Sequence, residues 1–308
     1  MDNGPSRAPE ASVSSHVADP RTIVSVRTIL FDMDGVLYLG DAPLPGVQAT
    51  LDYLEATGRT YCLITNNSTM TPSQYAEKLA GMGVTVAEEL ILTAGVATAR
   101  YLARLDPGGA PVYVIGERGL REPLEAHGFW QDDRAPRYVC VGLDRELTYH
   151  KLKVATLAIR AGARFIASNP DTTLPTEEGL VPGNGATLAA LRTATDVEPL
   201  VVGKPSAAIV DLAVEMLGAE KATTAIIGDR LDTDVLAGQN AGIGRILILT
   251  GVHQPADIPA FEGKPNWVVA DLAEFCRLLD GAPLVPIEPI EPMGPIEPIE
   301  PVETPRPR

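Results

Sequence analysis

The stretch over residues 28–38 constrains the fold more than any other part of the chain. An uninterrupted Ile-Leu-Phe run at 29–31 is typical of a strand that is buried on both faces of a parallel sheet. Asp32 and Asp34 follow directly, and because burying unpaired carboxylates is costly, we expect both to emerge at the carboxyl edge of that sheet. An isolated Asp-x-Asp sequence is also common in turns, so its meaning depends on the rest of the chain.

Three further polar clusters follow apolar, strand-like runs in the same way. Thr65 and Asn66 follow a Tyr-Cys-Leu-Ile run, Lys204 follows a Val-Val-Gly run, and Asp229 and Asp234 follow an Ala-Ile-Ile-Gly run. In a doubly wound sheet the ends of all four strands lie along one edge, where open α/β folds bind their ligands. The sequence therefore predicts a polar site that is assembled from four strand ends.

The residue types at this edge indicate phosphate chemistry with a metal ion. Four carboxylates close together would repel one another and raise some of their pKa values unless a cation lay between them. An all-oxygen site without His or Cys selects a hard ion, and Mg²⁺ is the usual one in phosphate chemistry. Phosphoryl transfer needs such a site, with an in-line nucleophile, charge neutralisation and a proton donor for the leaving group.

The alternation of strand and helix patterns predicts an α/β fold with two units. We expect a doubly wound parallel-sheet core over residues 21–106 and 199–282. An inserted, smaller α/β unit is expected over 107–198, because an Asp-Pro-Gly-Gly sequence interrupts the chain and the alternation then restarts. Residues 1–20 are expected to form a disordered arm, and the Pro-Ile-Glu-rich residues 283–308 a disordered, solvated tail.

Bulk composition argues against several classes of partner. The net charge of −15 disfavours a general nucleic-acid binder, which needs a basic surface. No stretch of the sequence is long and apolar enough to span a bilayer, and the first residues lack the apolar core of a signal peptide. The three cysteines are scattered, so neither a zinc site nor a disulfide framework is indicated. We therefore expect a cytoplasmic protein without a nucleic-acid or membrane partner.

Four short motifs, taken in order, resemble those of the haloacid dehalogenase (HAD) superfamily. They read Asp-Met-Asp-Gly-Val-Leu, Thr-Asn-Asn-Ser, Gly-Lys-Pro and Gly-Asp-Arg-Leu-Asp-Thr-Asp. The large insertion between the second and third motifs makes the chain most similar to the 4-nitrophenylphosphatase-like subfamily, over residues 22–279. The resemblance implies a HAD-like, Rossmannoid core with a large (type II) α/β cap.

This resemblance also implies a role for each residue of the phosphate site. Asp32 would be the nucleophile that forms an aspartyl-phosphate, and Asp34 would act as general acid and then as general base. Thr65 and Asn66 would hold the phosphoryl group. Lys204 would steady the negative charge of that group and of the nucleophile.

The resemblance implies a Mg²⁺ site as well. Asp32, the main-chain carbonyl of Asp34 and, as a direct ligand, Asp229 would hold the ion, while Asp234 would support the surrounding network. Asp232 has no assigned role in this pattern, and an exposed capping position near the following helix is expected for it.

The cap over residues 107–198 would close over the leaving group of the substrate. Asn169, Asp171 and Asn184 lie in turns similar to the substrate-facing loops of such caps, so they are candidates for substrate specificity. The resemblance also allows a homodimer through the cap.

The leading functional hypothesis is a Mg²⁺-dependent phosphatase, a hydrolase that acts on phosphoric monoester bonds of a small phosphorylated metabolite. One alternative is a dehalogenase-type hydrolase on the same fold, although relatives of that type need neither Asp34 nor the metal. The other alternative is a catalytically silent regulatory or binding module. The substrate is open among sugar phosphates, glycerol phosphate, phosphoglycolate, nucleoside monophosphates and pyridoxal phosphate.

Overall fold

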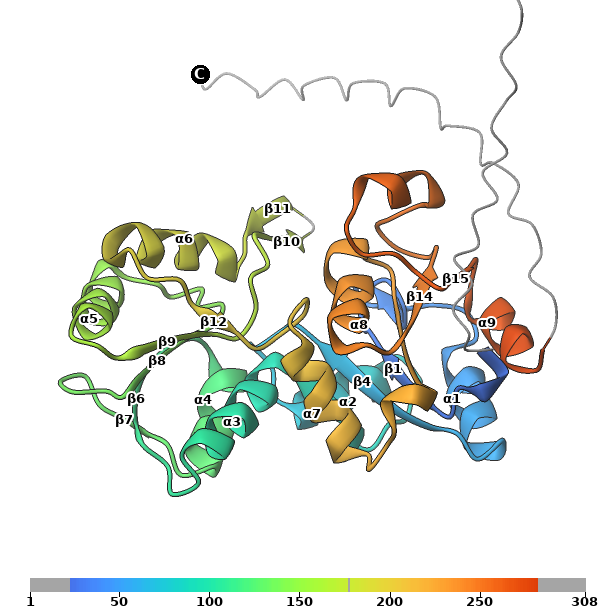
Figure 1. Ribbon diagram of the computed structural model, residues 1–308, viewed down its shortest axis with the longest axis horizontal. Coiled ribbons are helices and arrows are strands. Elements are labelled where there is room, and N and C mark those ends of the chain that lie inside the picture. Colours follow the sequence, from blue (N-terminus) through green and yellow to red (C-terminus); the bar gives the residue numbers. More distant parts are fainter. Residues whose placement is uncertain (1–22, 177, 282–308) are drawn as a thin grey trace, which may run out of the picture.

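The structure is a computed structural model that describes residues 23–176 and 178–281. The predicted N-terminal arm and the Pro-Ile-Glu tail lie outside the described residues. Two α/β units lie next to each other, and each is built on its own parallel sheet (Figure 1). We call the elements from β6 to β12 the cap unit and the remainder the core unit. This arrangement confirms the predicted fold class.

The core unit holds a six-stranded sheet with the order β15-β14-β13-β1-β4-β5. Its strands are β1 (Thr28–Phe31), β4 (Thr60–Thr65), β5 (Ile91–Thr93), β13 (Thr224–Gly228), β14 (Gly244–Ile248) and β15 (Trp267–Val269). Strand β1 pairs with β13 on one side and with β4 on the other, so that Thr28 aligns with Thr224 and with Thr60. The apolar run at 29–31 is therefore an interior strand, as predicted.

Helices cover both faces of the core sheet. They are α1 (Val47–Ala56), α2 (Pro72–Gly81), α3 (Ala94–Leu105), α7 (Ala207–Met216), α8 (Leu236–Ala241) and α9 (Leu272–Leu279). Ile29 and Phe31 pack into a hydrophobic cluster with α1, α2 and α9, whereas Leu30 packs into another with α3, α7 and α8. Because side chains alternate along a strand, this burial on both faces explains why the run is wholly apolar.

The cap unit holds a five-stranded sheet with the order β12-β9-β8-β6-β7. Its strands are β6 (Pro111–Ile115), β7 (Trp130–Gln131), β8 (Tyr138–Val141), β9 (Arg164–Ala167) and β12 (Leu200–Val201), and its helices are α4 (Arg118–Ala126), α5 (Tyr149–Arg160) and α6 (Asn184–Thr195). Helices α5 and α6 pack on one face of the sheet and α4 on the other. Among the described residues, no helix combines the length and the apolar character needed to cross a membrane.

The two units share a hydrophobic cluster where α4 of the cap crosses α3 of the core. Leu102 of α3 and Leu120 of α4 both belong to it. The backbones approach so closely at this crossing that a Cβ atom on Gly95 would lie only 2.0 Å from the carbonyl oxygen of Gly119. The cap is thus packed against the core through apolar side chains as well as joined to it by the chain.

Two features of the fold differ from the sequence interpretation. The run before Lys204 forms β12, which pairs with β9 in the cap sheet and not with a core strand. Lys204 therefore lies in the turn between the cap sheet and α7, and only three of the four polar clusters follow core strands. The hairpin of β10 (Thr173–Thr176) and β11 (Gly179–Pro182) and the short hairpin of β2 (Tyr38–Leu39) and β3 (Ala42–Pro43) were not predicted.

Candidate active site

Three of the predicted site residues lie at the carboxyl ends of neighbouring core strands. Asp32 follows β1, Asp229 follows β13, and Thr65 is the last residue of β4. The N–H of Asp32 donates to the carbonyl oxygen of Ile227 at 2.9 Å, which continues the β1–β13 ladder by one residue. The sheet itself therefore fixes the backbone from which the Asp32 carboxylate projects.

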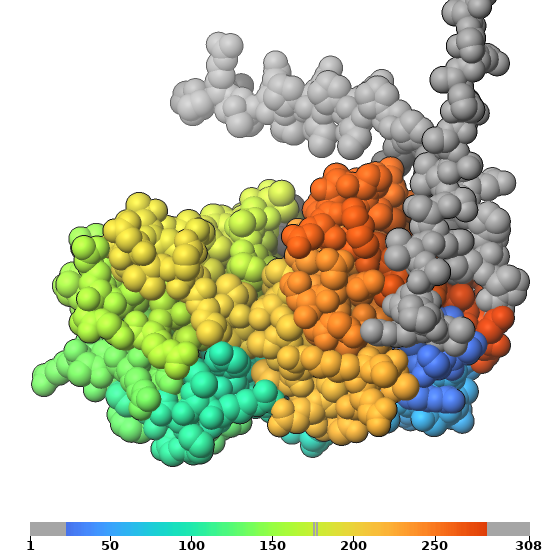
Figure 2. Space-filling view, in the orientation of Figure 1, coloured from blue at the N-terminus to red at the C-terminus, as the bar shows by residue number. Residues whose placement is uncertain are grey.

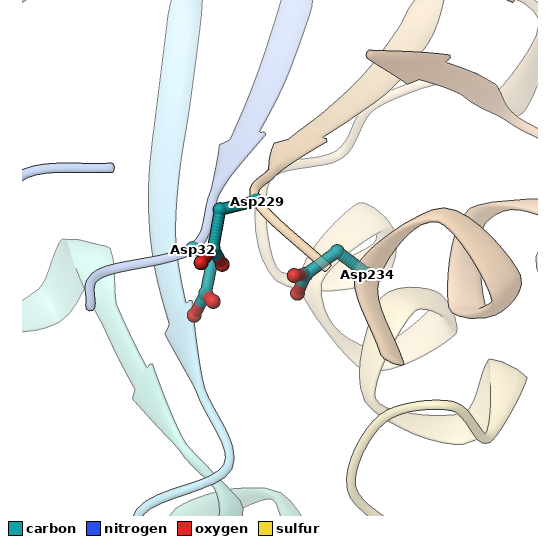
Figure 3. Close-up of side chains that lie close together, drawn as sticks. All are labelled: Asp32, Asp229 and Asp234. Carbon is teal, nitrogen blue, oxygen red and sulfur yellow. The ribbon is translucent and has the colours of Figure 1, made fainter. Parts of the chain in front are cut away.

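Asp32, Asp229 and Asp234 form a buried group that we call the acidic cluster. Each offers a carboxylate oxygen that lies within 4.8 Å of the others. Figure 3 shows the Asp32 and Asp229 side chains next to each other, with the Asp234 carboxylate directed toward them. Burial raises the pKa of Asp32 and of Asp229 to about 6 and that of Asp234 to about 7, and repulsion between the carboxylates acts in the same direction.

Lys204 supplies the positive charge next to this cluster. Its Nζ lies 2.6 Å from Asp32 Oδ1 and 2.6 Å from Asp234 Oδ1, and its side chain is only 2 % exposed. Burial alone would lower the pKa of Lys204, but the carboxylates of Asp234 and Asp32 raise it above the ordinary value. The ammonium group therefore stays charged and bridges two acidic residues from separate strand ends.

The acidic cluster fits a hard divalent cation. Its donors are all carboxylate oxygens, the ligands that such ions prefer. Within the described part of the chain, Asp229 Oδ1 is buried without a hydrogen-bond partner, while Asp229 Oδ2 accepts from the N–H of Val252 at 2.8 Å. Asp234 is different, because Oδ1 accepts from Lys204 and Oδ2 accepts from the N–H of Arg230 at 3.2 Å. Asp229 thus has an oxygen without a hydrogen bond, whereas both oxygens of Asp234 already accept one.

Two glycines let the backbone pack directly against the Asp229 carboxylate. A Cβ atom on Gly35 would lie 2.4 Å from Asp229 Oδ2, and one on Gly251 would lie 2.1 Å from the same atom. Gly35 has φ of 77°, which also favours glycine. Thr250 Oγ1 donates to the carbonyl oxygen of Gly35 at 2.5 Å and ties the two segments together. The carboxylate therefore has little freedom to move.

Asp34 lies in the loop after β1, and its side chain is exposed. The hydroxyl of Tyr38 donates to Asp34 Oδ2 at 3.3 Å. Desolvation by the surrounding protein atoms raises the pKa of Asp34, while Lys78 and the hydrogen bond from Tyr38 oppose this shift. Asp34 is thus the exposed carboxylate of the motif, in contrast to the buried Asp32.

The loop after β4 carries the other predicted phosphate ligands. Thr65 is buried and its Oγ1 accepts from the N–H of Asn67 at 3.1 Å. The side-chain amide of Asn66 donates to the carbonyl oxygen of Lys204 and to Asp171 Oδ1, both at 2.9 Å. Both amide hydrogens of Asn66 are therefore in use, and this residue joins the core loop to Lys204 and to the cap.

Of the three cap residues predicted to set specificity, Asn169 and Asp171 contact this same loop and Asn184 contacts Asn169. Asn169 Nδ2 donates to the main-chain oxygen of Asn66 at 2.7 Å, and Asn184 Nδ2 donates to the main-chain oxygen of Asn169 at 2.7 Å. Both asparagines are buried, whereas Asp171 is half-buried and accepts from Asn66. Asn169 and Asp171 thus link the loop after β9 to the core, and Asn184 ties the start of α6 to that loop.

Arg230, Asp232 and His253 surround the acidic cluster without having been predicted as site residues. Arg230 Nη2 lies 2.9 Å from Asp232 Oδ2, and this ion pair replaces the helix-capping position expected for Asp232. The N–H of Leu231 donates to the buried ring nitrogen Nδ1 of His253 at 3.1 Å. These contacts hold the π-helical turn Leu231–Val235, which carries Asp234. The sequence could have pointed to Arg230, because this residue lies inside the fourth motif, between Asp229 and Asp232.

Comparisons with known proteins agree with this geometry. A family described as haloacid dehalogenase-like hydrolase matches residues 29–130, and a second HAD-hydrolase-like family matches residues 201–275. The acid sugar phosphatase of Staphylococcus aureus strain USA300 is 40% identical over 249 residues, which make up 80% of this chain and 96% of that protein.

Solved structures give the same result. The 4-nitrophenylphosphatase TM1742 of Thermotoga maritima has a TM-score of 0.80 at 36% identity, covering 84% of this chain and 99% of its own. NagD from Escherichia coli K-12 has a TM-score of 0.76 at 35% identity, covering 81% and 98%. The chain therefore belongs to the haloacid dehalogenase superfamily and is a phosphatase of its 4-nitrophenylphosphatase-like subfamily.

Proposed function

We propose that this phosphatase hydrolyses small phosphomonoesters in a Mg²⁺-dependent reaction that passes through an aspartyl-phosphate on Asp32. The placement of Asp32 supports this most strongly. Its carboxylate lies at the end of an interior strand, 2.6 Å from the Lys204 ammonium and next to Asp229. A carboxylate in this position can attack phosphorus while neighbouring positive charge offsets the charge of the phosphoryl oxygens.

The residues that would hold Mg²⁺ are Asp32, Asp229 and the main-chain carbonyl of Asp34, with Asp234 supporting the network. The orphaned oxygen of Asp229 favours it as a direct ligand. When bound, the ion neutralises negative charge on the carboxylates and on the transferring phosphoryl group. Burial, and after it repulsion between the carboxylates, raises the pKa values of the acidic cluster, and a bound cation would favour the ionised carboxylates.

The reaction proceeds in two displacements at phosphorus. A carboxylate oxygen of Asp32 forms a bond to phosphorus while the ester P–O bond breaks, and Asp34 transfers a proton to the departing alcohol oxygen. Asp34, now ionised, then takes a proton from a water molecule whose oxygen attacks the same phosphorus. The acyl phosphate bond breaks, inorganic phosphate leaves, and Asp32 regains its carboxylate.

Three residues would hold the phosphoryl oxygens during both steps. Lys204 has three ammonium hydrogens and uses two on Asp32 and Asp234, which leaves one for the substrate. The hydroxyl of Thr65 lies at the end of the adjacent strand. Since both side-chain amide hydrogens of Asn66 are taken, we assign its contribution to its main-chain N–H.

The cap unit would choose the substrate. We infer that Asn169 and Asn184 fix the position of the cap loop, because both are buried and bonded to main-chain oxygens. Asp171, which is less buried, is the candidate for contact with the leaving group. Among the substrates that the sequence left open, the name of the Staphylococcus aureus relative favours sugar phosphates. A homodimer through the cap and a cytoplasmic location stay predictions.

A phosphate-release assay over a panel of metabolites, with and without Mg²⁺, tests this function. Asp32→Asn should lower kcat by about 10³-fold or more, since it removes the nucleophile. Chelator should abolish turnover and Mg²⁺ should restore it, whereas the larger Ca²⁺ should support it poorly. Asp52→Asn is the matched control, because Asp52 is an exposed residue of α1 whose carboxylate accepts from Gln48 of the same helix.

Two results would contradict the proposal. Near-normal phosphate release by Asp32→Asn would exclude the covalent route through this residue. Full activity in excess chelator, together with turnover of haloacids, would favour the dehalogenase-type alternative instead.

A further inference from the structure

Tyr38 is a buried residue whose hydroxyl group reaches the active-site loop. Its side chain is 1 % exposed, yet the hydroxyl donates to Asp34 Oδ2 at 3.3 Å. Within the described residues, this is the only side-chain hydrogen bond that Asp34 makes. An exposed aspartate in a loop would otherwise sample several rotamers, so Tyr38 restricts the orientation of its carboxylate.

The position of Tyr38 is itself well defined. Its ring lies under the ammonium of Lys78, with Nζ 4.3 Å from the ring centroid. Tyr38 also packs with the buried Tyr75 in the hydrophobic cluster on this face of the core sheet.

We propose that Tyr38 is a positioning residue that holds the Asp34 carboxyl group for proton transfer to the leaving oxygen. This inference rests on the proposed role of Asp34 as the general acid. It also assigns different tasks to the two carboxyl oxygens of Asp34. Because Oδ2 accepts from Tyr38, the proton that passes to the leaving group is carried on Oδ1.

The consequence depends on the leaving group. In the first displacement the Asp32–phosphorus bond forms, the ester P–O bond breaks, and the Asp34 proton moves to the departing oxygen. A 4-nitrophenolate ion is stable enough to leave with little protonation, whereas an alkoxide needs the proton as the bond breaks. Loss of the Tyr38 hydroxyl should therefore slow alkyl phosphates far more than aryl phosphates with good leaving groups.

The test compares kcat/KM of Tyr38→Phe for glycerol 3-phosphate and for 4-nitrophenyl phosphate. General acids contribute about 10²–10⁴-fold, so we expect a fall of about tenfold or more for glycerol 3-phosphate and less than about threefold for 4-nitrophenyl phosphate. The ratio of the two values does not depend on the fraction of folded enzyme. Tyr61→Phe is the matched control and should leave both values unchanged, because the buried Tyr61 lies near the amino end of β4 and its hydroxyl donates to Glu55 Oε1 at 3.3 Å.

Asp34→Asn, measured on the same two substrates, separates this inference from the proposed function. It should show the same selectivity as Tyr38→Phe, to a greater extent. The positioning role of Tyr38 is wrong if Asp34→Asn is selective but Tyr38→Phe lowers kcat/KM equally for the two substrates or for neither. If Asp34→Asn itself shows no selectivity, the general-acid role of Asp34 fails, and the inference falls with it.

Discussion

Replacing Lys204 by methionine should destabilise the metal-free protein, and the loss should depend on pH. The Lys204 ammonium lies 2.6 Å from Asp32 and 2.6 Å from Asp234, and it is 2 % exposed. Removing one partner from a buried ion pair costs about 3–5 kcal/mol, because the remaining charges stay buried without compensation. We expect a loss of this size in the free energy of unfolding at pH 8 in chelator.

A surface pair of the same length gives the matched control. Lys221 Nζ also lies 2.6 Å from a carboxylate, that of Asp211, but the two side chains are 47% and 41% exposed. Exposed pairs contribute about 1 kcal/mol or less, so Lys221→Met should cost little at any pH. Since the distances are equal, a difference between the two variants reports the burial of Lys204 together with its second carboxylate partner.

The pH dependence follows from the raised pKa values of Asp32, about 6, and Asp234, about 7, against an ordinary value of 3.8. A group whose pKa is higher in the folded than in the unfolded protein contributes most to the free energy of unfolding at low pH. That contribution is lost as the pH rises through the pKa of the folded state. Removing Lys204 should raise the pKa values of Asp32 and Asp234 further, because its ammonium group lowers both. The loss caused by Lys204→Met should therefore be largest above pH 7 and shrink toward pH 5, where the carboxyl groups bind protons.

Urea unfolding followed by tryptophan fluorescence at pH 5 and pH 8, with chelator present, measures these differences. Equal losses at the two pH values would refute the assignment of two carboxylates to the ammonium. A loss no greater than that of Lys221→Met would refute the argument from burial.

Two further substitutions test how the backbone and the cap act on the site. Gly251→Ala places a Cβ within 2.1 Å of Asp229 Oδ2, so the variant should need several-fold more Mg²⁺ for half-maximal activity. The control is Gly108→Ala, whose added Cβ meets nothing within 4 Å. Identical Mg²⁺ titrations of the two variants would contradict the prediction. Asn184→Ala should change the ranking of substrates that differ in their leaving groups and spare 4-nitrophenyl phosphate most, whereas an equal loss of kcat/KM across the panel would show that it acts on the common chemistry.

The sequence predicted those parts of the site that local patterns encode. Asp32 and Asp229 follow wholly apolar runs, and such runs are strands buried on both faces. The start of α2 also depends on local residues alone, because Thr71 and Gln74 form a capping box there. These features depend on neighbours in the chain.

Features that depend on distant partners were not predictable in the same way. A two-residue strand, Leu200–Val201, carries no information about which sheet it joins, and pairing with β9 decided it. The β10–β11 hairpin contains prolines and exposes Leu180, so the alternation that marks a half-buried strand is missing. The contact of Tyr38 with Asp34 needs the loop to fold back on itself, and no local pattern in the sequence indicates this.

The order of strands in the core sheet has a consequence for how the protein folds during synthesis. Strand β1 pairs with β13, about 200 residues farther along the chain, and the whole cap unit is synthesised between them. The cap strands pair with closer neighbours, so the cap sheet can form while half of the core sheet is still missing. Asp32 meets Asp229 only when β13 docks beside β1. The catalytic centre is therefore among the last parts of the molecule to exist, and a truncated chain that folds its cap would still lack it.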